Sequence, residues 1–74
     1  MTDPRERWDH VAWCKARALQ YLDAGDLNGA LTSMGSDMAK REDCRINPHF
    51  YAAGMMAVAA GDAAAVRRWV EGFN

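Results

Sequence analysis

Apolar side chains recur along this chain with the spacing of α-helices, in four separate segments. Residues at i, i+3, i+4 and i+7 share one face of a helix, so this spacing gives a segment one face that can be buried. The pattern predicts an all-α fold of four short helices, over residues 4–24, 27–41, 48–60 and 63–71. Each start carries a capping signal: Asp3 and Asn47 precede a proline, and an aspartate precedes each of the other two helices.

Some positions depart from the simple pattern. Lys15 falls within the apolar arc of the first helix, and Trp13 falls within the polar arc, whereas Trp8 and Trp69 lie in apolar arcs. We therefore expect Trp8 and Trp69 to be buried and Trp13 to be exposed. The segment 48–60 is apolar nearly all round, so we expect it to be the central and most enclosed helix.

The same dipeptide, Gly-Asp, separates the helices of each pair, as Gly25-Asp26 and Gly61-Asp62. Glycine can take the left-handed conformation that ends a helix, and aspartate can cap the next one. So short a connection predicts an antiparallel helical hairpin, so that the fold is two Gly-Asp-linked hairpins joined by the loop REDCRIN, residues 41–47. Strain at the turn predicts that Gly61→Val is more destabilising than Gly54→Ala.

The first turn also has a resemblance to a known repeat. The segment 25–31, Gly-Asp-Leu-Asn-Gly-Ala-Leu, resembles the turn of a tetratricopeptide repeat, whose period is about 34 residues. The second copy has Val66 where alanine is expected, and no proline ends the second helix. A true repeat and a plain four-helix domain over residues 1–74 both remain open.

Charge and hydropathy narrow the possible partners. Ten acidic residues nearly balance nine basic ones, giving a net charge of −1, and the basic residues are scattered. Such a chain offers no sustained positive field for a nucleic-acid backbone. The longest apolar run, residues 50–60, is about half of the ~20 residues that a membrane span requires, and the first ten residues lack the apolar core of a signal peptide. We expect a cytoplasmic protein with neither a nucleic-acid nor a membrane partner.

Three stretches carry a second resemblance: ALQYLDAGDLNGAL (18–31), SMGSDMAK (33–40) and VRRWVEGFN (66–74). Together they resemble small proteins encoded by tailed phages of actinobacteria, such as mycobacteriophages. The resemblance covers most of the chain. This sequence departs from the phage pattern at REDCRIN, where a His-Pro type turn is expected. It implies a phage gene product that acts in the bacterial host cytoplasm, and it carries over no catalytic residue and no activity.

The cysteines and histidines form one candidate metal site, made of His10, Cys14, Cys44 and His49. Two Cys and two His can hold zinc tetrahedrally. Their spacing matches no zinc-finger pattern, and we expect His10 to project away from the apolar arc that contains Cys14. We therefore predict no metal and no other cofactor. A small zinc-binding domain, such as a nucleic-acid accessory factor, remains an alternative.

Trp13 is the best candidate for a contact with a partner, with Asp9 one turn before it and Arg17 one turn after it. Large aromatic residues are enriched where proteins bind one another, although this ring could also lie flat against its own helix. No constellation of catalytic residues is recognisable, so we predict that the chain is not an enzyme. The sequence favours a non-enzymatic phage protein that binds a host or phage protein as an inhibitor, adaptor or modulator. A homo-oligomeric structural unit is a further alternative.

Overall fold

The computed structural model describes residues 4–73 and contains four α-helices. They are α1 (Pro4–Asp23), α2 (Leu27–Met38), α3 (Pro48–Ala59) and α4 (Ala63–Glu71), with one 3-10 turn, η1 (Glu42–Cys44), between α2 and α3. Residues 4–73 contain no strand, so the predicted all-α fold is confirmed. The predicted helix cap Asp3 lies outside the described residues.

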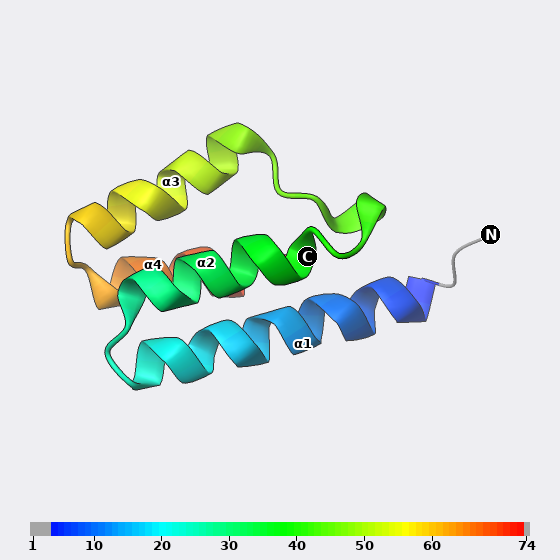
Figure 1. The fold of residues 1–74 in the computed structure, drawn as a ribbon, viewed down its shortest axis with the longest axis horizontal. Coiled ribbons are helices and arrows are strands. Elements are labelled where there is room, and N and C mark those ends of the chain that lie inside the picture. Colours follow the sequence, from blue (N-terminus) through cyan, green and yellow to red (C-terminus); the bar gives the residue numbers. More distant parts are fainter. Residues whose placement is uncertain (1–3, 74) are drawn as a thin grey trace.

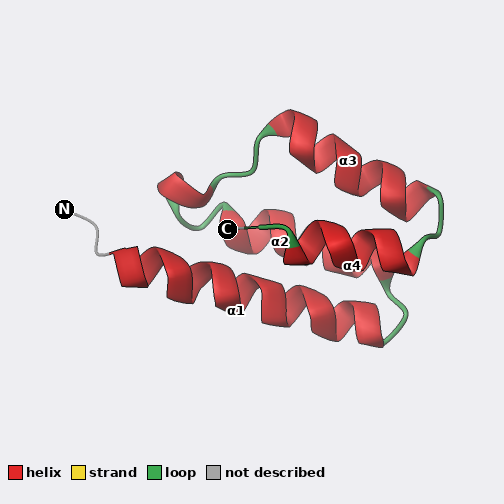
Figure 2. Ribbon diagram, turned by 180° about the vertical axis from the view of Figure 1, so that it is seen from behind, coloured by secondary structure: helices red, strands yellow, loops and turns green. Residues whose placement is uncertain are grey.

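The helices form three layers, which Figures 1 and 2 show from opposite sides. α2 and α4 lie side by side in the middle layer, with α1 against one side of it and α3 against the other. The most extensive packing joins α1 to α2. Both Gly-Asp turns lie at one end of the long axis, and η1 lies at the other end (Figure 1). None of the described helices is both long enough and apolar enough to span a bilayer.

The two Gly-Asp turns have the predicted geometry. Gly25 and Gly61 have φ angles of 81° and 65°, in the left-handed region that favours glycine. The carboxylates of Asp26 and Asp62 each accept a hydrogen bond from the backbone N–H three residues later, at 2.8 and 3.0 Å. The predicted pair of antiparallel hairpins is therefore confirmed.

The core is built mainly from α1, α2 and α4. The buried residues of α1 are three or four positions apart and form one stripe along the helix, which faces buried residues of α2 and α4. The buried apolar residues are Val11, Cys14, Ala18, Leu22, Ala30, Leu31, Met34, Met38, Cys44, Val66, Trp69, Val70 and Phe73.

Trp8 lies outside this core, contrary to the prediction. Its side chain is 58% exposed, whereas Trp69 is 7% exposed as expected. Lys15 donates from Nζ to the carbonyl oxygen of Glu71 at 3.2 Å, so the last turn of α4 lies beside Lys15. Trp8 is seven residues earlier in α1, about 10 Å further along the helix axis. Its side of α1 is therefore left uncovered because α4 is too short to reach it.

α3 forms one of the two outer layers and is the most exposed of the described helices, so the prediction that it is the most enclosed helix is wrong. Its only buried residue is Gly54, whereas Phe50, Met55 and Met56 are exposed. The middle layer has two sides, and α1 already occupies one of them. α3 therefore contacts the rest of the protein along a single face, although its own residues are apolar on nearly all sides of the helix.

α3 approaches α4 closely at Gly54. A Cβ atom at this position would lie 2.6 Å from Cε2 of Trp69 and 2.8 Å from Cδ1 of Leu31. The indole Nε1–H of Trp69 donates to the carbonyl oxygen of Phe50 at 2.8 Å, which fixes the ring against the backbone of α3. The close approach makes Gly54 sensitive to substitution as well as Gly61, whose φ of 65° disfavours any side chain.

α2 ends at Met38, three residues earlier than predicted, and the following segment is not a plain loop. The carbonyl oxygen of Asp37 accepts a hydrogen bond from Nε2 of His10 at 2.8 Å. The backbone N–H groups of Lys40 and Arg41 donate to the carbonyls three residues earlier, each at 3.3 Å, so α2 ends in a tight turn. The N–H of Cys44 then donates to the carbonyl of Arg41 at 3.1 Å and closes η1. Cys44 at the end of η1 is 2% exposed and joins the core.

We expect Gly54→Ala to lower the free energy of unfolding by about 2 to 3 kcal/mol, because the added methyl group must displace the Trp69 ring. Gly61→Ala is the matched control, because its methyl group meets open space and only the left-handed backbone costs about 1 kcal/mol. Chemical denaturation of both variants measures the difference. A larger loss for Gly61→Ala would contradict the close contact between α3 and α4.

Candidate functional site

The Trp13 side chain lies beside two cations on the surface where α1 meets α2. It is 42% exposed. Cζ of Arg17 and Nζ of Lys40 each lie 4.9 Å from the centre of the ring, within the range of a cation–π contact. The His10 ring lies 5.8 Å from the Trp13 ring, centre to centre. We call this group, together with Asp37, the Trp13 cluster.

Asp37 connects the two cations of the cluster through its buried carboxylate. Its carboxylate is almost fully buried and accepts from Nε of Arg17 at 2.8 Å and from the hydroxyl of Ser33 at 3.2 Å. Nζ of Lys40 lies 3.3 Å from its other oxygen. A buried carboxylate needs such compensation for its lost hydration. Within the described part of the chain, no buried side-chain nitrogen or oxygen lacks a hydrogen-bond partner.

His10 packs against Cys14, contrary to the expectation that it points away from it. Its Nε2 lies 2.8 Å from the carbonyl oxygen of Asp37 and 3.5 Å from Sγ of Cys14. Because a carbonyl oxygen can only accept, Nε2 must carry the hydrogen. This nitrogen therefore cannot also take a proton from the Cys14 thiol.

The Cys14 thiol is unreactive because it is buried. Burial raises its pKa to about 11, and the nearby Asp37 and Cys44 contribute to the rise. Burial is also the main cause of the raised pKa of Cys44. Since the thiolate is the nucleophilic form, the His10–Cys14 contact is not a catalytic pair at neutral pH.

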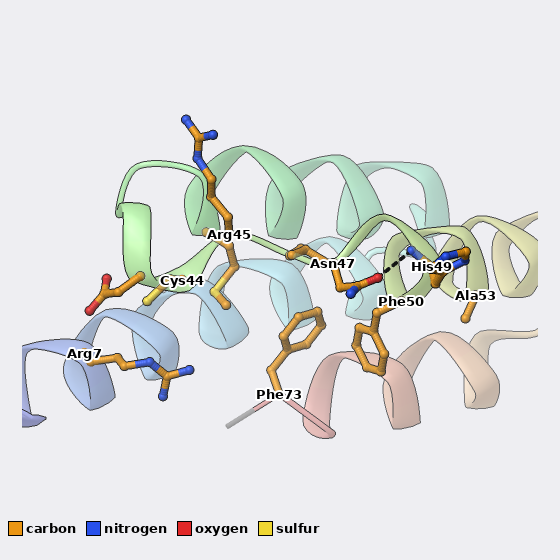
Figure 3. Close-up of a pocket in the computed structure, with 11 residues that line it drawn as sticks. Arg7, Cys44, Arg45, Asn47, His49, Phe50, Ala53 and Phe73 are labelled. Atoms are coloured by element: carbon orange, nitrogen blue, oxygen red, sulfur yellow. Dashed lines mark hydrogen bonds between the residues drawn. The ribbon is translucent and has the colours of Figure 1, made fainter.

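The four Cys and His residues of the candidate zinc site do not converge. His10 and Cys14 are in contact, whereas Cys44 and His49 lie at opposite ends of a groove (Figure 3). Within residues 4–73, no three His, Cys, Asp or Glu side chains are placed so that they could hold one metal ion. The fold therefore does not bring together the four residues that the sequence alone allowed to form one zinc site.

The groove in Figure 3 is about 560 Å³ in volume and runs from η1 to the start of α3. Phe50 and Phe73 meet edge to face within it, with ring centres 4.9 Å apart. Arg7 and Arg45 lie at its rim, and Arg45 points away from it (Figure 3). This groove was not predictable from the sequence, because it forms where α2 ends early and η1 turns the chain.

The structure brings together part of the site predicted around Trp13. Arg17 lies against the ring as expected, whereas Asp9 is exposed to solvent. Asp37 and Lys40 were missed because they come from α2 and from the turn that follows it, far from Trp13 in the sequence. One signal could have indicated Asp37: it follows Met34 by three residues, so it falls on the buried face of its helix.

Comparison with known proteins adds no family to this description. No protein-family model, no curated protein and no solved structure matches the chain. The Trp13 cluster is therefore interpreted from its own geometry.

We expect Asp37→Ala to lower the free energy of unfolding by about 2 to 3 kcal/mol, because the Arg17, Lys40 and Ser33 donors lose their shared acceptor. Asp9→Ala is the control, because it removes the same charge from an exposed position and should cost less than about 0.5 kcal/mol. Urea denaturation compares the two variants. Equal losses would mean that the buried network does not stabilise the α1–α2 contact.

A second prediction concerns alkaline pH. The pKa of the Cys14 thiol is raised from 9.0 to about 11 in the folded protein, so the folded protein keeps a proton that the unfolded chain loses in this range. The stability that this provides is complete below pH 9 and is lost as the pH rises towards 11. We expect the melting temperature to fall more steeply over this range in the unmodified protein than in Cys14→Ala. Parallel curves would contradict the raised pKa.

Proposed function

We propose that this chain is a non-enzymatic docking protein that binds another protein through Trp13 and the two cations beside it. The observation that carries the proposal is the half-exposed Trp13 ring in contact with both Arg17 and Lys40. Tryptophan and arginine dominate the binding energy of many protein interfaces. A cluster of this kind suits an inhibitor, adaptor or modulator.

The cluster is organised before any partner arrives. Asp37 holds Arg17 at 2.8 Å and Lys40 at 3.3 Å, so both cations are already positioned beside the ring. Ordering a long side chain on binding costs about 0.5 to 1.5 kcal/mol, and a surface that is ordered beforehand avoids most of that cost. Trp8 is the natural comparison on the same helix, because its ring is more exposed than that of Trp13, at 58% against 42%.

The charge of the cluster indicates the chemistry of the partner. Arg17 and Lys40 each carry a positive charge, and Asp37 neutralises only one of them. The surface around Trp13 therefore suits an apolar pocket with carboxylates at its rim, because the ring can fill the pocket while the cations meet the acidic groups.

The resemblance to small proteins of actinobacterial tailed phages supports a host or phage protein as this partner, in the bacterial cytoplasm. The quiet chemistry of Cys14 supports a role without catalysis, because its thiol stays protonated and its neighbouring imidazole cannot act as a base towards it.

Trp13→Ala and Trp8→Ala form a matched pair that tests the proposal, since both remove an exposed indole from α1. Each variant and the unmodified protein are used to capture proteins from the lysate of an actinobacterial host, with and without phage infection. We expect one partner that the unmodified protein and Trp8→Ala retain and that Trp13→Ala loses. Its retention should weaken as salt is raised from about 50 to about 500 mM, because salt screens exposed charges.

The control for folding is the helical circular dichroism, which both substitutions should leave unchanged. The proposal is wrong if no protein shows this difference between the two variants, or if retention is independent of salt.

A further inference from the structure

The outward face of α3 is an exposed apolar surface without any charge. No residue from Pro48 to Ala59 is charged, whereas each of the other three helices carries at least one charged residue. Met55 is 50% exposed and Met56 is 73% exposed. Soluble proteins rarely expose large apolar side chains side by side, and where they do, the patch commonly marks an interaction site. We call Ala52, Met55, Met56, Ala59 and Ala60 the α3 face.

We propose that the chain pairs with a second copy of itself through the α3 face. The two α3 helices run antiparallel about a two-fold axis that passes between Met55 and Met56. This inference goes beyond the docking function, because it uses a helix on the other side of the middle layer from α1, which carries Trp13 (Figures 1 and 2).

The shape of the α3 face is complementary to itself. Met56 lies at its centre, with Ala52 one turn before it and Ala59 and Ala60 one turn after it. A methionine side chain from one helix can therefore enter the space above the alanines of the other helix, as a knob enters a hole in a coiled coil. A two-fold axis produces this contact twice, because each copy supplies both the knob and the hole.

The area of the α3 face suits a weak, reversible pair. The face exposes on the order of 400 Å² of apolar surface per copy, so that a pair buries about 800 Å², which is in the range of weak and transient interfaces. Such a small interface is expected to associate reversibly, with a dissociation constant in the micromolar range or weaker.

The charges at the two ends of α3 favour a second copy in the antiparallel orientation. Arg45 precedes the helix, and Asp62 follows it at the end of the molecule where both Gly-Asp turns lie (Figure 1). Antiparallel pairing places Arg45 of one copy towards Asp62 of the other, whereas parallel pairing would bring like charges together. A lipid surface fits less well, because helices that bind membranes carry lysine and arginine along the polar edge, and α3 has neither.

The decisive variant is Met56→Lys, with Gln20→Lys as its control, because both place one new charge at an exposed helical position. Sedimentation equilibrium from about 1 µM to about 1 mM measures the mass. We expect the unmodified protein and Gln20→Lys to reach twice the monomer mass, with association at least tenfold weaker in Met56→Lys. A monomer up to about 1 mM would overturn the proposal, as would a monomer that binds phosphatidylcholine vesicles through Met56.

Cross-linking tests the orientation. Ala52→Cys and Ala59→Cys are mixed and oxidised, while the native Cys14 and Cys44 stay protected by burial. Antiparallel pairing predicts that the mixed disulfide forms in preference to either symmetric one, and a preference for Cys bridges between like positions would overturn it. Trp13→Ala should pair as the unmodified protein does, so a failure of the docking function and a failure of this inference are separate results.

Discussion

The buried carboxylate of Asp37 is the interaction on which most of this structure depends. Through its side chain it joins α2 to Arg17 of α1 and holds Lys40 in place, so that two cations are fixed beside Trp13. Through its backbone carbonyl, close to the end of α2, it also accepts from His10 of α1. One residue thus ties together the main helix contact and the exposed aromatic surface.

The second hairpin depends on a different contact, between Trp69 and α3. The ring lies under Gly54, where no side chain is present, and donates its N–H to the carbonyl of Phe50. Phe73 meets the edges of the same aromatic group, with its ring centre 4.9 Å from that of Trp69. This packing holds α3 along one line only. The opposite side of the helix keeps its apolar residues in solvent, which is unusual for a helix without charges.

The features that the sequence predicted are those that local chemistry determines. The starts of α2, α3 and α4, and both left-handed turns, follow from a capping residue or a glycine at the position itself. The exposure of Trp13 was also predictable, because its position on the polar arc follows from helical periodicity alone.

The features that the sequence did not predict depend on what lies opposite each residue. Trp8 is exposed because α4 ends beside Lys15, and periodicity cannot tell how far a covering helix reaches. His10 turns towards Cys14 because its acceptor, the Asp37 carbonyl, comes from another helix.

The layered arrangement has one more consequence: since α1 and α3 flank the middle layer on opposite sides, both surfaces can be occupied at once. A pair of copies would then carry Trp13 twice, so a partner with two acidic pockets would rebind at a high effective concentration and be held by avidity rather than by the strength of either contact.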